Sequence, residues 1–392
     1  MSVPRAVPPG QHLPTYAREL VRMHDAVIAG SSSTLRPRAV VSRSWSRVLG
    51  LGLKADDVNA RNWLGEAAIA RRREASPLRE VVPDLENIVG SLADASQLLL
   101  VVTDREGVIL WRSGTPAVRR RADALGFFEG ADWTERRVGT NSIGTALAEA
   151  APVELLAGEH FEQGQHPWYC TATPVHDPRT GELLGVIDVS GPALTLHPAI
   201  GALVETGRLL AESRLWRYHQ ERLERLRTVG APVLTSGPAL VVDDHGWVAA
   251  AHGVAVGSRI AVPVAGQPLA VPGLGACVPE RLADGWLIRP SSADRTVTLV
   301  LDLTGTPQVR LSGGDADWRR TVTRRHAEIL VLLHRAGRDG LSAEALSRAL
   351  YWDADHVVTA RAEVSRLRRL LGALVETRPY RLSGDVRMSV VS

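Results

Sequence analysis

The hydrophobic pattern of this chain changes its period near residue 97, and that change constrains the fold more than any other feature. Before it, apolar residues recur every three or four positions in stretches that begin near Thr15, Arg38 and Pro77, which predicts three helices. After it, LLLVVTDREGVILW reads as two strands joined at Asp104–Gly107, a hairpin signal. A helix that packs on a sheet of this kind gives an α+β arrangement.

The elements expected further along the chain continue this mixture. We expect a short helix at 139–150, strands at 152–157, 168–176 and 183–190, and a long helix at about 195–228. From Gly230 to Gly314 the chain is rich in Gly and Pro and alternates in short strands, and helical periodicity returns at Trp318. The predicted fold is therefore multidomain α+β, with divisions at 1–76, 77–229, 230–315 and 316–392.

Composition excludes several classes of protein. No apolar run reaches the roughly 18 residues that a membrane span needs, and the N-terminus lacks a signal-peptide core, so we expect a cytoplasmic protein without a membrane partner. Cys170 and Cys277 are the only cysteines, too few for a disulfide framework or a multi-thiolate zinc site. The only lysine, Lys54, is not part of a P-loop, and kinase signatures are missing. No cofactor is expected.

A dense set of short motifs lies between Val138 and Pro192. They are Gly139-Thr140-Asn141, Gly144-Thr145-Ala146-Leu147, Glu159-His160-Phe161, His166-Pro167-Trp168, Cys170-Thr171-Ala172 and Gly185-Val186-Ile187-Asp188-Val189-Ser190-Gly191. This stretch resembles the GAF domains of bacterial activators of the acetoin-catabolism type, and Ser44-Trp45-Ser46-Arg47 fits the helix that precedes the domain there. The resemblance places a GAF-like α/β sensor at 77–229, as in GAF-domain transcriptional regulators of actinobacterial type.

That resemblance implies a ligand pocket between a sheet face and its covering helices, where small apolar or aromatic effectors are the usual class. Such a pocket needs apolar walls and a few placed polar groups. The candidate ligand-binding residues are Asn141, His166, Trp168, Tyr169, Thr171 and Asp188. Each has a structural alternative: Asn141 is a candidate helix cap, Trp168 a candidate core residue, and Asp188 a candidate acceptor of loop backbone hydrogen bonds.

His166 and Cys170 also suggest an enzyme or a redox sensor as an alternative, because an imidazole beside a thiol can make the thiol nucleophilic. A GAF-fold thiol-based reductase or a redox sensor would use such a pair. That chemistry generally needs a resolving cysteine, and Cys277 lies in another segment. The spacing of His160, His166, Cys170 and His176 matches no standard zinc pattern. We therefore expect no catalytic residues and no metal site.

Three amphipathic helices and a terminal hairpin are predicted for the last segment, which is the layout of a winged helix. The helices are RRHAEILVLLHRAG, LSAEALSRALY with Ser342 as its cap, and VVTARAEVSRLRRLLG, and the two strands of ETRPYRLSGDVRMSVV are expected to join at Ser383-Gly384-Asp385. The runs Val364–Leu371 and Arg378–Leu382 resemble the recognition helix and wing of winged-helix response-regulator effector domains.

The third of these helices divides into two faces. Val357, Ala360, Val364, Leu367 and Leu371 form one apolar stripe at spacings of three and four. The candidate DNA-binding residues lie off that stripe or in the hairpin: Thr359, Arg361, Ser365, Arg366, Arg368, Arg369, Arg378, Tyr380 and Arg381, with Arg387 beside them. Residues 316–392 hold 14 arginines against 9 acidic residues, an excess of +5 that suits a polyanion.

The sequence thus predicts a ligand-responsive transcription regulator. Its expected partners are double-stranded DNA, an unidentified small-molecule effector, a second copy of the chain, and RNA polymerase. Leucines on the 195–228 helix form the candidate dimer seam, although Arg214, Arg217 and His219 interrupt a strict heptad. A signalling adaptor whose C-terminal segment binds protein remains an alternative.

Overall fold

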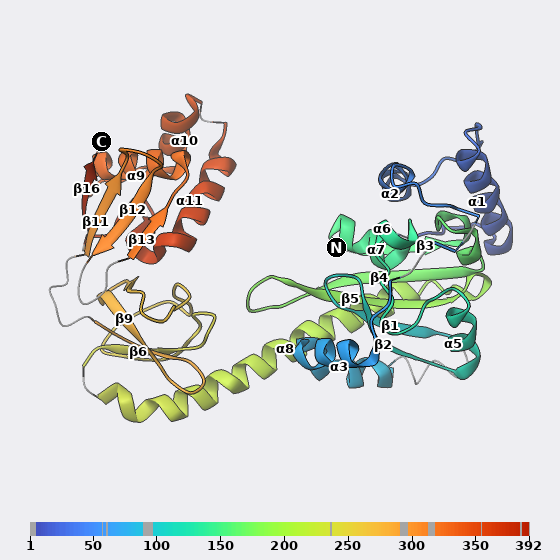
Figure 1. The fold of residues 1–392 in the computed structure, drawn as a ribbon, viewed down its shortest axis with the longest axis horizontal. Helices are drawn as coiled ribbons and strands as arrows, with labels where there is room; N and C mark the ends of the chain where they lie inside the picture. Colours follow the sequence, from blue (N-terminus) through green and yellow to red (C-terminus); the bar gives the residue numbers. More distant parts are fainter. Residues whose placement is uncertain are drawn as a thin grey trace. The chain divides into compact units, whose positions relative to one another are not determined.

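The computed structural model describes residues 5–56, 58–59, 62–88, 97–235, 237–290, 297–312, 318–353, 355–384 and 386–391 (Figure 1). The chain separates into two compact units, Met1–Tyr218 and His219–Ser392. The sequence predicted a finer division into four segments, and that division stays a prediction.

Helices form the N-terminal part of the first unit. They are α1 (Leu13–Ile28), α2 (Ala39–Leu49) and α3 (Glu66–Ala75), followed by the short 3₁₀ turn η1 (Pro77–Glu80) and helical residues 82–88. Trp45 and Val48 are buried, whereas Leu49 is 53% exposed. Leu49 is the last residue of α2 and lies at the edge of the buried stripe that Val41, Ser44, Trp45 and Val48 form. The predicted helix from Pro77 to Gln97 begins as a 3₁₀ turn, and residues 89–96 lie outside the described residues.

A five-stranded antiparallel sheet is the centre of the first unit. Its order is β2 (Ile109–Gly114), β1 (Leu99–Thr103), β5 (Leu183–Pro192), β4 (Trp168–His176) and β3 (Val153–Leu156). The predicted hairpin between β1 and β2 is confirmed, and its turn is closed because Asp104 Oδ1 accepts the backbone N–H groups of Glu106 and Val108 at 2.9 and 3.0 Å.

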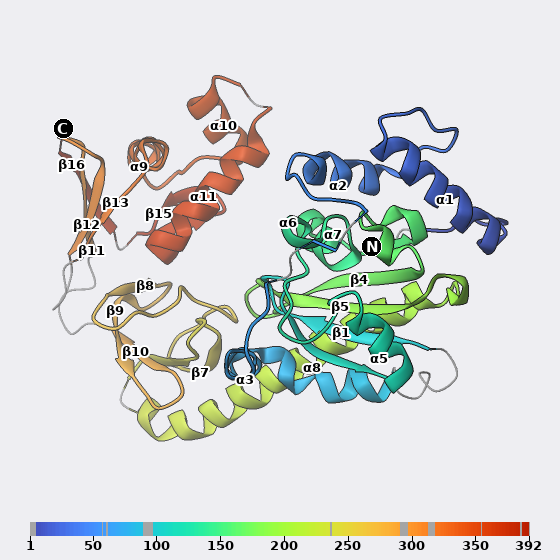
Figure 2. The same cartoon turned by 45° about the vertical axis from the view of Figure 1, so that its right-hand side comes forward.

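Helices cover both faces of this sheet. Figures 1 and 2 show α1, α2, α6 (Glu135–Val138) and α7 (Ser142–Glu149) on one side, and α3 with the first part of α8 (Ile200–Gly230) on the other. The remaining short elements are α5 (Pro116–Asp123), η2 (Ala157–Glu159), η3 (Gln163–Gln165) and η4 (Ala193–Thr195). The short helix, the strands and the long helix predicted for 139–228 are therefore present.

The second unit begins within α8 and continues through η5 (Ala231–Thr235) into another five-stranded antiparallel sheet. Its order is β7 (Val248–His252), β6 (Ala239–Val242), β10 (Trp286–Pro290), β9 (Gly275–Arg281) and β8 (Leu269–Val271). Strands β6 and β7, which lie within ALVVDDHGWVAAA, form a strand–turn–strand unit.

The C-terminal helices pack on a four-stranded sheet of the order β13 (Trp318–Thr321), β12 (Gln308–Ser312), β11 (Val297–Asp302) and β16 (Val386–Val391). The helices are α9 (Arg324–Ala336), α10 (Ala343–Tyr351) and α11 (Val357–Leu371), followed by η6 (Gly372–Leu374), β14 (Val375–Thr377) and β15 (Tyr380–Leu382). Strands β11 and β12, which the sequence assigned to the segment 230–315, thus belong to the sheet under the C-terminal helices.

The predicted terminal hairpin is wrong in its strand pairing, because the two strands expected to pair with each other have other partners. The hairpin is β14–β15, which turns at Arg378–Pro379, and the bend at Ser383-Gly384 leads into β16, which pairs in parallel with β11. The reason is that both edges of β15 are occupied. Tyr380 bonds to Leu341 through two backbone hydrogen bonds of 2.8 and 2.9 Å on the edge that β14 leaves open, so β16 pairs elsewhere.

Candidate functional site

A cavity of about 760 Å³ lies in the first unit, between α1 and the loops at one end of the sheet. Its lining combines residues from α1 with Arg121 near the end of α5, Ala157 of η2, and the loops at His166-Pro167 and 192–194. The full lining set is Pro14, Ala17, Arg18, Val21, Arg22, Arg121, Ala157, His166, Pro167, Pro192, Ala193 and Leu194. A volume of this size suits a small organic ligand.

His166 connects this cavity to α1 and α2. Its ring meets the buried ring of His24 edge-on, with the centroids 4.6 Å apart, and His24 in turn meets Trp45 at 5.6 Å. His24 Nε2 lies 2.9 Å from the carbonyl oxygen of Phe161. Burial, reinforced by His24 and His160, lowers the pKa of His166 to about 4, so its imidazole is neutral at pH 7.

Asp188 is the centre of a buried polar cluster on the α7 side of the sheet. Ser142 Oγ donates to Asp188 Oδ1 at 2.7 Å, and Ser190 Oγ donates to Asp188 Oδ2 at 2.6 Å. The register pairs Cys170 with Ser190 and Ala172 with Asp188, so these side chains share one face. Burial raises the pKa of Asp188 to about 7, and the two serine hydrogen bonds oppose that rise.

The other predicted ligand residues lie in different surroundings. Asn141 caps α7, because its side chain accepts the Gly144 N–H at 2.9 Å and donates to the Gly139 carbonyl at 2.9 Å. Tyr169 and Thr171 are fully buried on the sheet face opposite Asp188. Trp168 is buried at 4% exposure, and the guanidinium of Arg121 lies 5.7 Å from its ring centre.

Of the six predicted ligand residues, all of which the structure describes, His166 is the one that lines the cavity. The sequence reasoning missed Arg18, Arg22 and Arg121. Arg18 and Arg22 are four residues apart and therefore on one face of α1, which was readable, but the docking of that face against residues 157–194 is a long-range contact that no local pattern encodes.

The two cysteines do not form a reactive pair. Desolvation raises the pKa of Cys170 well above its ordinary value, and burial raises that of Cys277 to about 12. Both thiols are free, and they belong to different units. Since the thiolate is the nucleophile, the raised pKa of both thiols does not support the reductase alternative.

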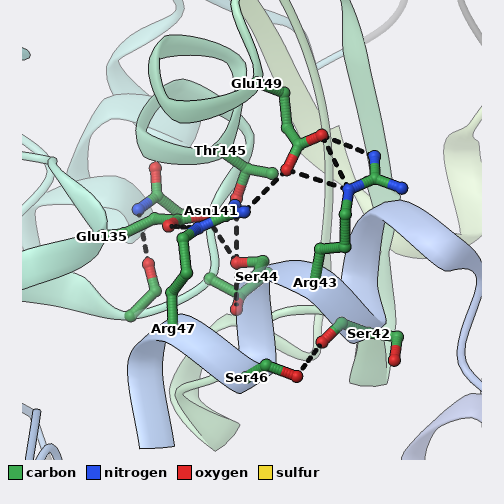
Figure 3. A network of polar contacts seen from close by, with 11 residues as sticks. Ser42, Arg43, Ser44, Ser46, Arg47, Glu135, Asn141, Thr145 and Glu149 are labelled. Atoms are coloured by element: carbon green, nitrogen blue, oxygen red, sulfur yellow. Dashed lines mark hydrogen bonds and ion pairs between the residues drawn. The ribbon is translucent and has the colours of Figure 1, made fainter. Parts of the chain in front are cut away.

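A polar network fixes α2 to the helices above the sheet (Figure 3). Arg47 donates to both carboxylate oxygens of Glu135, at 2.7 and 2.9 Å, and its third nitrogen reaches Glu149 at 2.7 Å. Ser44 Oγ is buried beneath them, 2.6 Å from Glu135 and 2.7 Å from Thr140. The Ser44-Trp45-Ser46-Arg47 motif therefore joins the preceding helix to α6 and α7.

The candidate nucleic-acid surface is the outer face of α11. Ala360, Val364, Leu367 and Leu371 are buried at 3% exposure or less, and Val357 is half-buried, as the predicted stripe requires. The six candidate DNA-binding residues of this helix are all exposed: Thr359, Arg361, Ser365, Arg366, Arg368 and Arg369. Arg366 forms an ion pair with Glu363 on the same helix.

The hairpin candidates differ from one another. Arg378 and Arg387 are exposed, whereas Arg381 is half-buried, with its Nε 2.6 Å from Glu376 Oε2. Tyr380 is 8% exposed and packs in the core of the C-terminal helices. The sequence made Tyr380 a candidate DNA-binding residue, and this burial removes its side chain from the surface that DNA could contact. It is buried because its ring packs into the hydrophobic cluster that α9, α10 and α11 form with the sheet.

No three of the His, Cys, Asp and Glu side chains among the described residues are arranged to hold a metal ion. None of the helices within the described ranges has the length and apolar character to cross a membrane.

Comparison with known proteins gives similarity along the whole chain. The family model described as "MimR, N-terminal domain" matches residues 22–206. The acetoin dehydrogenase operon transcriptional activator AcoR of Bacillus subtilis is 36% identical over 160 residues, covering 41% of this chain and 26% of AcoR. The propane 2-monooxygenase operon transcriptional activator MimR of Mycolicibacterium smegmatis is 29% identical over 197 residues, covering 49% of this chain and 32% of MimR.

The chain therefore spans about a quarter to a third of the length of these two activators. A longer match is the "Uncharacterized 47.3 kDa protein in thcA 5'region" of Rhodococcus erythropolis, which is 31% identical over 400 residues, covering 98% of this chain and 75% of that protein. The chain belongs to the same family as this Rhodococcus protein.

Proposed function

We propose that this chain is a ligand-responsive transcription regulator, in which the unit Met1–Tyr218 senses a small molecule and the C-terminal helices bind double-stranded DNA. The observation that carries the proposal is the division of α11 into a buried apolar stripe and an exposed face with four arginines, a serine and a threonine. A helix with this face matches the major groove, where arginine pairs with guanine through two hydrogen bonds.

Two further observations support this proposal. AcoR and MimR, to which this chain is similar, are named transcriptional activators of operons, and the MimR N-terminal domain model matches residues 22–206, within the first unit. The first unit has the arrangement expected of a GAF-like sensor, a five-stranded antiparallel sheet between layers of helices, and a cavity at its end. Helix α8 leads directly from this unit into the second, so it is the covalent route by which ligand occupancy would alter DNA binding.

We propose that regulation acts through occupancy of a promoter, without ATP hydrolysis by a P-loop, because the only lysine of the sequence, Lys54, is not part of such a motif. Ligand binding would favour one arrangement of two chains over another and thereby change the spacing of paired DNA-binding domains. Dimer formation through α8 is part of the proposal. On that helix, Leu209 and Leu210 are 53% and 38% exposed, which leaves apolar side chains available for a second copy.

The test is selection of binding sites from a random pool of duplex DNA by the full chain. We expect recovery of a common sequence, and loss of that selection when Arg366 and Arg369 are both changed to Ala. The matched control is Arg310→Ala, because Arg310 is exposed on β12 between the buried residues Val309 and Leu311 and therefore points away from the helices. Unbiased recovery by the native chain would contradict the proposal and favour a C-terminal segment that binds protein.

A further inference from the structure

The cavity beneath α1 has one sign of charge. Arg18, Arg22 and Arg121 contribute three guanidinium groups to its lining, and no Asp or Glu is among the lining residues. All three arginines are exposed, and none has an ion-pair partner among the residues that the structure describes. His166 adds no charge at neutral pH, since its pKa is about 4. The three guanidiniums therefore face the cavity without an internal counter-ion.

The remaining lining is apolar. Ala17 and Val21 of α1 face Ala157, Ala193 and the exposed side chain of Leu194, with three prolines completing the wall. Exposed apolar side chains at the edge of a concave site gain free energy when a ligand covers them. A polyanion without an apolar part would leave these walls in water, and a neutral apolar molecule would leave the guanidiniums unmatched.

Combining the two observations, we propose that this cavity binds an amphipathic organic anion, with a carboxylate or phosphate group held by Arg18, Arg22 and Arg121 and an apolar body against Val21, Ala193 and Leu194. Guanidinium groups recognise both oxyanions through paired N–H donors. This inference deepens the proposed sensing function, because it names the class of effector and places it outside the sheet interior.

The position of the cavity connects the ligand to the helices that precede the sheet. Five of the lining residues come from α1, and the same helix supplies His24, which contacts both His166 and Trp45 of α2. A ligand that draws Arg18 and Arg22 toward Arg121 would therefore bias the packing of α1 against η2 and η4, and through Trp45 the packing of α2.

The experiment is isothermal titration calorimetry of the full chain with octanoate, octyl phosphate, benzoate, octanol and inorganic phosphate. We expect saturable binding of at least one of the organic anions, about tenfold or more tighter than that of octanol or inorganic phosphate. Raising the salt concentration should weaken this binding, since the guanidiniums are exposed. The double variant Arg18→Gln/Arg121→Gln should lose at least about tenfold in affinity.

The matched control is Arg120→Gln, which removes an exposed arginine next to Arg121 that does not line the cavity, and it should bind as the native chain does. The proposal is overturned if no organic anion binds at millimolar concentration, if octanol binds as tightly as the anions, or if the double variant binds like the control. Failure here is distinct from failure of the regulator proposal, because DNA-site selection needs none of these three arginines.

Discussion

Ser142 of α7 donates its hydroxyl proton to Asp188 of β5 across 2.7 Å, and this bond ties the covering helix to the central sheet at a point fully removed from water. Ser190 satisfies the second carboxylate oxygen at 2.6 Å, and Asp188 forms no ion pair with an arginine or lysine among the residues that the structure describes. An acid with hydrogen-bond donors but without a cation is costly to ionise in such a place.

The first prediction concerns this carboxyl group and pH. Burial raises the pKa of Asp188 from 3.8 to about 7. Between these two pH values the folded chain therefore keeps the Asp188 carboxyl protonated, whereas the unfolded chain has released that proton. Its contribution to stability is therefore complete below about pH 4 and is lost as the pH rises through about 7. Asp188→Asn should remove this dependence. We would measure the free energy of unfolding by urea denaturation at about pH 5 and at about pH 8. Between these two values the native chain should lose on the order of 2 kcal/mol more of this free energy than the variant. The same change of unfolding free energy with pH in the native chain and in Asp188→Asn would contradict this prediction.

The second prediction concerns the attachment of α2. Arg47 bonds both oxygens of Glu135, whose side chain is 8% exposed, so Arg47→Ala leaves a nearly buried carboxylate with Ser44 as its remaining hydroxyl donor. We expect a loss of roughly 1 to 2 kcal/mol of unfolding free energy, reduced by the partial exposure of Arg47. Arg43→Ala is the matched control, because Arg43 is more exposed and should cost less. Equal losses would argue against a specific role for the Arg47–Glu135 pair.

The third prediction concerns the start of α7. Asn141 accepts the Gly144 N–H, so Asn141→Ala should destabilise the first unit by about 1 kcal/mol. Asn141→Asp keeps the acceptor for the Gly144 N–H but loses the donor to the Gly139 carbonyl at this buried position, so it should recover only a minor part of that loss. If Asn141 instead served mainly as a ligand contact, the alanine variant would unfold like the native chain and lose only ligand affinity.

The fourth prediction concerns the thiols. Since the pKa values of Cys170 and Cys277 are both raised by desolvation, little thiolate is present at neutral pH. We expect both to react with a disulfide reagent far more slowly in the folded chain than after denaturation. Rapid modification of one thiol in the folded chain would restore the redox alternative.

How much could be read from the sequence depended on the range of the contacts. The hairpin at Asp104–Gly107 and the stripe of α11 are set by neighbours a few residues apart, so turn chemistry and periodicity were sufficient to predict them. The cap role of Asn141, weighed as an alternative to ligand binding, was equally local.

The parts that sequence reasoning missed depend on distant partners. The pairing of β16 with β11 joins residues nearly 90 positions apart, and Tyr380 is buried because it packs in a core whose other members lie on distant helices and strands. The same holds for the cavity, whose arginines come from α1 and from the end of α5. Hydrophobic periodicity shows that a face is buried, but not which distant element covers it.

The most direct test of the central claim is a salt titration of DNA binding by the full chain on the selected duplex. For the native chain we predict that the logarithm of the DNA association constant falls steeply and linearly with the logarithm of the salt concentration. The slope should become shallower by about 1 to 2 in the Arg366→Ala/Arg369→Ala variant and should stay unchanged in Arg310→Ala. Binding that does not depend on salt, or slopes that are the same in all three proteins, would contradict the placement of α11 against DNA.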